Sequence, residues 1–237
     1  ANQILSSGNF CWAPQNTSVA IENKLIRIFS VGDTLKNQIY QKFLYHFEQL
    51  GRKKYGPNYT LQKEDLSYIV RLAAYFFKDE AKCKELDLDL NKGILLTGPM
   101  GVGKTTWFRL MQFILAKEHK FYYITCRDVN FEFLRRGFDV IEKYTKGLPN
   151  EFQKCSICFD DLGTENNIKY FGNECNVMQE ILLTRYDLFM DYGYKTHLTT
   201  NLSASEIEKY YTERVRSRLR KMMNVLAIPP DRKDKRC

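Results

Sequence analysis

The chain has 237 residues, of which 44% are hydrophobic and 27% are charged, with 13 Gly and 6 Pro. A chain of this length buries a core without disulfide bonds, and its composition excludes a disordered, collagen-like or low-complexity protein. The formal net charge is +8, and residues 203–237 hold an excess of five positive charges. Such a local excess fits either a solvated helix end or an element that binds a polyanion.

Targeting and redox signals are weak. Residues 1–15 lack a basic stretch followed by an apolar core, so we expect no secretory signal. No apolar run approaches the roughly 18 residues of a membrane span. Cys126, Cys155 and Cys158 lie in apolar runs, which predicts buried thiols of a reducing compartment and a cytoplasmic protein. Cys155 and Cys158 have C-x-x-C spacing, but no second pair completes a metal site.

The first predicted region, residues 1–90, is helical apart from an irregular leader. Apolar residues at helical spacing predict a helix over Asp33–Leu50, which ends at Gly51 before the turn pair Gly56-Pro57. A second helix is predicted over Gln62–Lys84. We interpret this region as an appendage to the domain that follows.

In the second region, residues 91–237, short apolar runs alternate with helical patterns, which indicates a parallel sheet covered by helices on both faces. The predicted strands are Gly93–Thr97, Phe121–Cys126, Cys155–Asp160, Lys195–Thr200 and Asn224–Ile228. The predicted helices are Lys104–Glu118, Asp128–Tyr144, Asn173–Tyr192 and Ser203–Met222. Gly137 is a candidate break in the second of these helices, and Ser203 with Glu206 fits a capping box.

The segment GPMGVGKT, from Gly98 to Thr105, matches the phosphate-loop pattern G-x-x-x-x-G-K-[ST] at every position. It follows a predicted strand and precedes a predicted helix, as the pattern requires. Its glycines let backbone N–H groups point at a phosphate, and the helix N-terminus adds partial positive charge. We expect Lys104 to reach the β- and γ-phosphates and Thr105 to bind Mg²⁺. The alternative is a chance glycine-rich turn.

Polar side chains follow two of the predicted strands. Asp160 and Asp161 end the third strand, where Asp160 would hold Mg²⁺ and Asp161 would act as the general base for an attacking water. The alternative is an acidic turn, and Glu165 is a weaker candidate base. Asn201 follows the fourth strand and would contact the γ-phosphate or its water, although Asn is also a common turn residue there.

The predicted helix Ser203–Met222 ends in a dense basic stretch. At helical spacing Arg214 and Arg218 share one face, and Arg216 and Arg220 share another. One face would supply an arginine finger to the phosphates of a neighbouring subunit, and the other would contact nucleic-acid phosphate. The alternative is a solvated helix end that the helix dipole favours.

The order of these motifs resembles the DnaC/IstB-like AAA+ ATPases, which are bacterial helicase loaders and transposase helper ATPases. The phosphate loop is typical of the whole P-loop superfamily, whereas the Asp-Asp-Leu-Gly run at Asp160 and the Arg-Val-Arg-Ser-Arg-Leu run at Arg214 are more specific. The resemblance covers about residues 90–230. It implies a P-loop NTPase of the AAA+/ASCE type, with a parallel five-stranded sheet in the order 5-1-4-3-2.

The resemblance also implies the cofactors ATP and Mg²⁺ and a role for each motif. Lys104, Asp161 and Asn201 would be catalytic, with either Arg218 or Arg214 as the arginine finger, and Arg185 resembles a recurrent arginine of undefined role. Thr105 and Asp160 would hold the metal. The nucleotide would bind Gly98, Pro99, Met100, Gly101, Val102, Gly103, Lys104, Thr105 and Thr106.

Two expectations concern the parts around these motifs. Residues 127–154 leave room for an extra helix that faces single-stranded DNA in this family, which makes Arg127, Arg135, Arg136 and Lys143 candidate DNA contacts. The chain also departs from the full AAA+ pattern, because no helical lid is expected after the fifth strand. Residues 1–90 have no counterpart in the resemblance, and a grip on the helicase is a hypothesis for them.

We therefore expect a DNA-handling ATPase, in the first place a loader of a replicative helicase, that hydrolyses ATP slowly, responds to single-stranded DNA or its partner, and forms a homo-oligomer when ATP is bound. A transposase helper that uses ATP as a switch is one alternative. A small-molecule kinase is another, against which the two-acid strand end favours water as acceptor. ATP is favoured over GTP because the guanine-reading pattern Asn-Lys-x-Asp is absent from the sequence.

Overall fold

The computed structural model describes residues 33–116, 119–146, 156–165, 168–170 and 173–236. Cys155 and residues 1–32, which include the predicted irregular leader, lie outside the described residues. No described helix is both long and apolar enough to cross a membrane.

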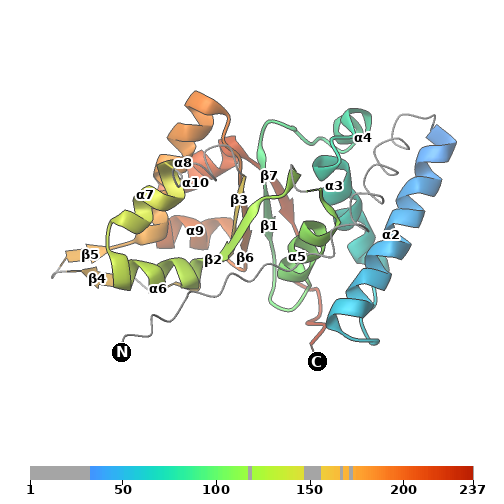
Figure 1. Cartoon of the computed structure of the whole chain (residues 1–237), viewed down its shortest axis with the longest axis horizontal. Helices are drawn as coiled ribbons and strands as arrows, with labels where there is room; N and C mark the ends of the chain where they lie inside the picture. Colours follow the sequence, from blue (N-terminus) through green and yellow to red (C-terminus); the bar gives the residue numbers. More distant parts are fainter. Residues whose placement is uncertain (1–32, 117–118, 147–155, 166–167, 171–172, 237) are drawn as a thin grey trace, which may run out of the picture.

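A parallel sheet of five strands forms the centre of the molecule (Figure 1). The strands are β1 (Gly93–Thr97), β2 (Tyr122–Thr125), β3 (Ile157–Leu162), β6 (Thr196–Thr200) and β7 (Met223–Ala227). They lie in the order β2-β3-β6-β1-β7, and every neighbouring pair is parallel. This is the order 5-1-4-3-2 read in reverse, so the predicted fold class is confirmed.

Helices cover both faces of the sheet, as expected for parallel strands (Figure 1). On one face lie α2 (Asp33–Tyr55), η1 (Lys63–Asp65), α3 (Leu66–Phe76), α4 (Glu80–Glu85) and α5 (Lys104–Ile114). On the other face lie α6 (Cys126–Arg136), α7 (Asp139–Lys146), α8 (Val177–Tyr192), α9 (Ala204–Tyr211) and α10 (Glu213–Met222). Alternate residues of β1 serve the two faces, since Ile94 and Leu96 enter one core and Leu95 enters the other.

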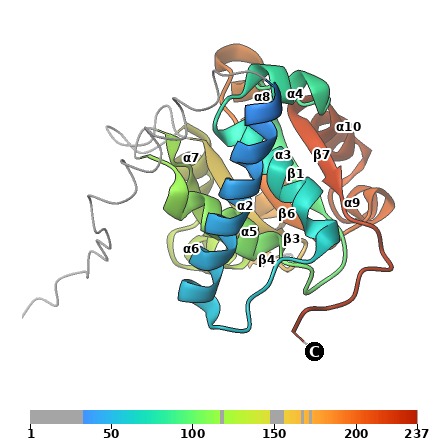
Figure 2. The same ribbon diagram turned by 90° about the vertical axis from the view of Figure 1, so that its right-hand side faces the viewer.

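The helices that precede the sheet pack on its phosphate-loop side. Figure 2 shows α2 lying across α3 and α5. Phe43 and Phe47 of α2 and Phe76 of α3 share one buried core with Phe108 of α5, and the rings of Phe76 and Phe108 meet edge to face at 6.1 Å. The proposed domain boundary after residue 90 stays a prediction.

Both helix boundaries predicted for this region need correction. Helix α2 continues through Gly51 to Tyr55. The missing side chain of Gly51 makes room for the ring of Tyr59, whose nearest atom would lie 2.1 Å from an added Cβ. The second predicted helix is two helices, α3 and α4. They separate at Lys78, which has a φ of +55°, and Asp79 caps α4 through the backbone N–H of Lys82.

Three helix predictions in the second region are also corrected. Helix α5 ends at Ile114 because Leu115 is extended. A short antiparallel hairpin, β4 (Ile168–Tyr170) and β5 (Asn173–Cys175), precedes α8 where a helix start was predicted, and Asn176 caps α8. The last predicted helix is split into α9 and α10 at Thr212, whose φ is +89°.

Three further predictions about local structure and burial are confirmed. Gly137 separates α6 from α7, as predicted. The capping box of Ser203 and Glu206 is present at the start of α9. Cys126 and Cys158 are buried free thiols, which confirms their predicted burial.

Candidate nucleotide-binding site

The phosphate loop connects the carboxyl end of β1 to the first turn of α5. Its backbone depends on glycine at two points. Gly98 has a φ of +148°, and an added Cβ would lie 2.6 Å from the Cβ of Ile228. Gly103 has a φ of +110°, and an added Cβ would lie 2.8 Å from Nε1 of Trp107. The loop is therefore built from residues that other side chains would displace.

Lys104 lies inside this loop and is only 4% exposed. Its Nζ donates hydrogen bonds of 2.7 Å to the carbonyls of Gly98 and Pro99 and to Oδ1 of Asn201. Burial lowers the pKa of Lys104 to about 8, against the opposing pull of Asp161 and Asp160. A buried ammonium with neutral acceptors gains from an anion placed beside it, as a phosphate would be.

Asp160 ends the buried part of β3 and is 1% exposed. Three hydroxyl groups donate to its carboxylate. Thr105 Oγ1 is 3.0 Å from both oxygens, Thr199 Oγ1 is 2.5 Å from Oδ1, and the Tyr123 phenol donates to Oδ2. The structure thus brings together the two residues predicted to hold the metal, Thr105 and Asp160.

This donor set fits Mg²⁺. The Thr105 hydroxyl and the Asp160 carboxylate are hard oxygen donors, and they already lie within hydrogen-bond distance of each other. Among the described residues no group of three His, Cys, Asp or Glu side chains forms a closed metal cage. Mg²⁺ is usually held by one or two protein oxygens, with water and substrate phosphates completing its octahedron.

Asp161 is the next residue, and its backbone is unusual for a non-glycine, with a φ of +56°. The pairing of β3 with β6 shifts register between Phe159 and Leu162 at this point. The backbone N–H of Asp161 donates to Thr199 Oγ1 at 2.8 Å. Burial, together with the charge of Asp160, raises the pKa of Asp161, as suits a group that takes up a proton.

Glu165 and Arg185 have partners of their own within the fold. Tyr211 and the backbone N–H of Gly163 donate to the Glu165 carboxylate. Arg185 is buried in α8 and donates to Thr196 Oγ1 at 2.6 Å and to two backbone carbonyls. These contacts tie loops and helices to the sheet, a role that the sequence did not indicate for Arg185.

The predicted finger residues make different contacts. Arg218 donates to the carbonyl of Leu183 at 3.0 Å, lies 3.5 Å from Asp187 and stacks over the ring of Tyr186. Arg214 is exposed on α10. These contacts of Arg218 lie on α8, away from the phosphate loop of its own chain.

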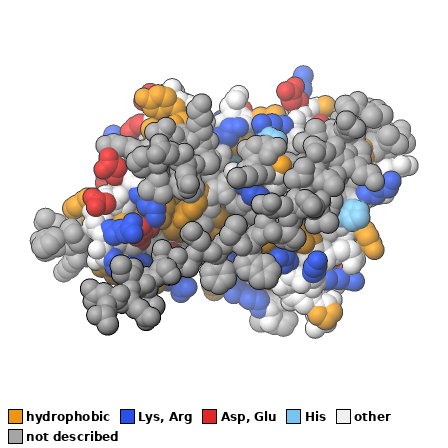
Figure 3. Space-filling model, viewed as in Figure 1, with side chains coloured by type: hydrophobic (Ala, Val, Ile, Leu, Met, Phe, Trp, Pro, Cys, Tyr) orange, Lys and Arg blue, Asp and Glu red, His pale blue; other side chains and the backbone are white. Residues whose placement is uncertain are grey.

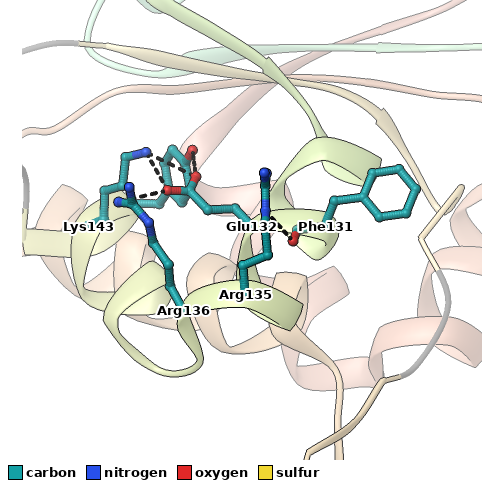
Figure 4. Close-up of polar contacts among 6 residues, drawn as sticks. Phe131, Glu132, Arg135, Arg136 and Lys143 are labelled. Carbon is teal, nitrogen blue, oxygen red and sulfur yellow. Dashed lines mark hydrogen bonds and ion pairs between the residues drawn. The ribbon is translucent and has the colours of Figure 1, made fainter. Parts of the chain in front are cut away.

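The candidate DNA contacts lie on α6 and α7, the helices predicted between the second and third strands. Lys143 is 2.8 Å and Arg136 is 3.4 Å from Oε1 of Glu132, whereas Arg135 donates to a backbone carbonyl of its own helix (Figure 4). Arg127 is exposed at the start of α6. The same helices expose large apolar side chains, namely Phe131 (52%), Leu134 (54%) and Phe138 (61%).

Part of the C-terminal charge excess is taken up by ion pairs. Lys and Arg side chains are spread over both halves of the face in Figure 3. Several of the C-terminal basic residues have acidic partners: Arg216 is 2.5 Å from Glu208, and both Arg232 and Lys235 pair with Asp65.

Residues 229–236 follow β7 and pass over the phosphate loop, and no helix forms in this described segment. The backbone N–H of Lys235 donates to the carbonyl of Gly101 at 3.2 Å. Its ammonium lies 5.2 Å from the centre of the Trp107 ring and pairs with Asp65, which is fully buried. Sequence reasoning missed this contact because 170 residues separate its partners.

Strand order, a phosphate loop after the first strand and an acidic pair on the strand two places away together define the fold of AAA+-type P-loop NTPases. This is the fold expected for DnaC/IstB-like proteins. The candidate nucleotide site lies at the carboxyl edge of the sheet, where open parallel sheets bind their ligands.

Comparisons with known proteins found similar solved structures at low sequence identity. No family model and no curated protein matches the sequence. The crystal structure of the DnaC helicase loader is 21% identical, with 59% of this chain and 79% of that chain covered and a TM-score of 0.41. A putative primosome component from Streptococcus pyogenes serotype M3 is 18% identical, with 73% and 84% covered and a TM-score of 0.48. AMPPCP-bound DnaA from Aquifex aeolicus is 18% identical, with 76% and 51% covered and a TM-score of 0.44.

Proposed function

We propose that the chain binds ATP with Mg²⁺ in the phosphate loop and hydrolyses it. The observation that carries this proposal is the convergence of four predicted residues at one sheet edge. Lys104 contacts Asn201, and Thr105 contacts Asp160, although these partners are 97 and 55 residues apart in the chain. A glycine-rich turn that matched the phosphate-loop pattern by chance would not be expected to lie beside both an acidic and a polar strand end.

Each residue then has a distinct task. Lys104 exchanges its carbonyl contacts for the β- and γ-phosphates, and Thr105 with Asp160 holds Mg²⁺. The metal, when bound, neutralises charge on the phosphate oxygens. Asp161 orients the attacking water and accepts its proton, and Asn201 positions the γ-phosphate or that water.

We propose that the complete site lies between two subunits of a homo-oligomer. Arg218 contacts α8, and Arg214 is exposed, so neither is committed to the phosphate loop of its own chain. Either one reaches a neighbouring nucleotide as an arginine finger, which stabilises transition-state charge in phosphoryl transfer. Arg218 would have to leave its contacts on α8 to reach a neighbouring subunit, whereas Arg214 is already exposed.

We propose that the ATPase acts in the cytoplasm on single-stranded DNA and loads a replicative helicase. The support is the surface of α6, where exposed Arg127, Arg135 and Arg136 lie beside exposed Phe131. Single-stranded nucleic acids bind surfaces that combine cations for the backbone with aromatic rings for the bases. The buried free thiols Cys126 and Cys158 fit a reducing compartment.

The test is steady-state ATP hydrolysis with Mg²⁺, with and without single-stranded DNA, for the wild type and Asp161→Asn. We expect hydrolysis that DNA stimulates and that falls at least about 100-fold in the variant, as for the loss of a general base. Asp191→Asn, an exposed residue of α8, is the matched control. Tight ATP binding without hydrolysis or DNA response would favour an ATP-gated switch and contradict the loader proposal.

A further inference from the structure

Tyr123 occupies a position in the site that the sequence pattern did not indicate. It lies on β2, and its hydroxyl reaches Oδ2 of Asp160 on the neighbouring strand β3. Thr125, rather than Tyr123, is the residue of β2 that stands opposite Asp160 in register. The length of the tyrosine side chain therefore brings its phenol to the carboxylate from two residues earlier in the strand.

A second contact fixes the direction of that hydrogen bond. Arg109 of α5 donates from Nε to the phenol oxygen of Tyr123 at 3.2 Å, and its guanidinium carbon lies 5.1 Å from the ring centre. The phenol oxygen accepts from Arg109, so its single hydrogen is directed to Asp160. Arg109 and Tyr123 thus form a chain of donors that ends on the Asp160 carboxylate.

The other two donors to Asp160, Thr199 and Thr105, differ in whether they are expected to keep this hydrogen bond when Mg²⁺ binds. Thr199 accepts the backbone N–H of Asp161 at 2.8 Å and gives its own hydrogen to Asp160, so it is a fixed anchor. Thr105 is the hydroxyl expected to turn to Mg²⁺ and leave the carboxylate. Tyr123 and Thr199 then remain, one on each carboxylate oxygen.

We propose that Tyr123, oriented by Arg109, is a positioning residue that fixes the Asp160 carboxylate for Mg²⁺–nucleotide binding. The inference rests on the proposed function of this site. Partners that hold a metal-binding carboxylate set its orientation, and their loss typically lowers metal affinity by about 10- to 100-fold.

The test is binding of a fluorescent ATP analogue at increasing Mg²⁺ concentration, with a parallel titration in EDTA. In Tyr123→Phe we expect the half-saturating Mg²⁺ concentration to rise about 10-fold, while the affinity in EDTA stays that of the wild type. Arg109→Gln is expected to shift the Mg²⁺ requirement in the same direction by a smaller factor. Arg109→Gln leaves the Tyr123 side chain in place. It therefore tests the hydrogen-bond chain from Arg109 through Tyr123 to Asp160 even if Tyr123→Phe does not fold.

The matched control is Tyr122→Phe, which removes the same atom from the neighbouring residue of β2. Tyr122 packs on Tyr144, in the core on the opposite side of the strand. A structural role for Tyr123 alone would change thermal stability and EDTA binding together, without a separate Mg²⁺ effect.

The outcomes separate the inference from the function on which it rests. A wild-type Mg²⁺ requirement in Tyr123→Phe, or a lower one, would overturn the positioning role while the nucleotide site stands. Wild-type protein that binds no nucleotide would overturn the proposed function itself.

Discussion

Lys104 is a buried cation, and the oxygens that accept its hydrogen bonds are all neutral. Desolvation disfavours its charged form, which explains why its pKa falls to about 8. A phosphate beside Lys104 would restore the charged form. If the proposed nucleotide binds here, the proton on Lys104 would link its binding to pH.

We predict that ATP affinity is constant near pH 7 and falls as the pH rises through about 8. The sign follows because the free protein loses the Lys104 proton in this range, whereas the phosphate binds the protonated form. The fall approaches about 10-fold per pH unit above the pKa of the free protein. Isothermal titration between pH 7 and 9.5 measures it.

Lys104→Arg is the control for this profile, since an arginine stays charged throughout the range. Its affinity, whatever its absolute value, is expected to be independent of pH. A falling profile shared by both proteins would assign the effect to another group.

Some residues of the candidate site could be predicted from the sequence, and others could not. Lys104, Thr105 and Asp160 belong to local patterns with fixed spacing, so the sequence indicates them. Tyr123 and Thr199 carry no pattern, and their place at Asp160 depends on which strands become neighbours. Asn201 had a turn as its alternative reading, and its contact with Lys104 adds a geometric reason for a role in the site.

At the scale of elements, helix propensity and packing disagree at Gly51. Glycine predicts a helix end there, yet α2 runs through it to Tyr55, and Gly56 follows with a φ of +106°. The ring of Tyr59 folds back onto the helix at the position where a side chain would be. Packing against Tyr59 thus favours glycine at position 51, although glycine alone lowers the stability of a helix.

We predict that Gly51→Ala lowers the free energy of unfolding by about 1–3 kcal/mol, the usual cost of overpacking. Propensity alone predicts the opposite, a gain of about 1 kcal/mol. Urea unfolding followed by circular dichroism distinguishes the two.

A double-variant cycle provides the control. In a Tyr59→Ala background the clash is absent, and Gly51→Ala is expected to stabilise the protein. A destabilising effect of equal size in both backgrounds would show that the Tyr59 ring is not the cause.

At the scale of the whole molecule, the buried carboxylate of Asp65 connects the two ends of the described chain. It lies in η1, before the sheet, and pairs with Arg232 and Lys235, which follow the last strand. The same segment bonds to the phosphate loop at Gly101. The helices before the sheet and the segment after it therefore meet beside the proposed nucleotide site.

We predict that Asp65→Asn releases residues 229–236 and lowers the free energy of unfolding by about 3 kcal/mol, because removal of the buried carboxylate leaves two partly buried cations without their partner. Hydrogen exchange of these residues should become faster, whereas that of the sheet should change little. Asp87→Asn, at an exposed acidic residue, is the control. Unchanged exchange of the segment would show that the ion pairs do not hold it.

The sheet was predictable because each strand is a local apolar run and parallel crossovers allow few arrangements. The β4–β5 hairpin was not, since each of its strands has only three residues, and the break at Thr212 was not, since threonine is not a typical helix breaker. The ion pairs of Asp65 depend on partners 167 and 170 residues away in the sequence. Such contacts follow from the finished fold rather than from any local pattern.

The central claim is that the loop at Lys104 binds ATP, and calorimetric titration of Mg²⁺–ATP tests it most directly. We predict saturable binding with one site per chain for the wild type and for Lys42→Ala, an exposed lysine of α2. Lys104→Ala is expected to lose at least about 10-fold in affinity, the equivalent of one charge-assisted hydrogen bond or more. Equal binding by wild type and Lys104→Ala, or no binding by either, would contradict the claim.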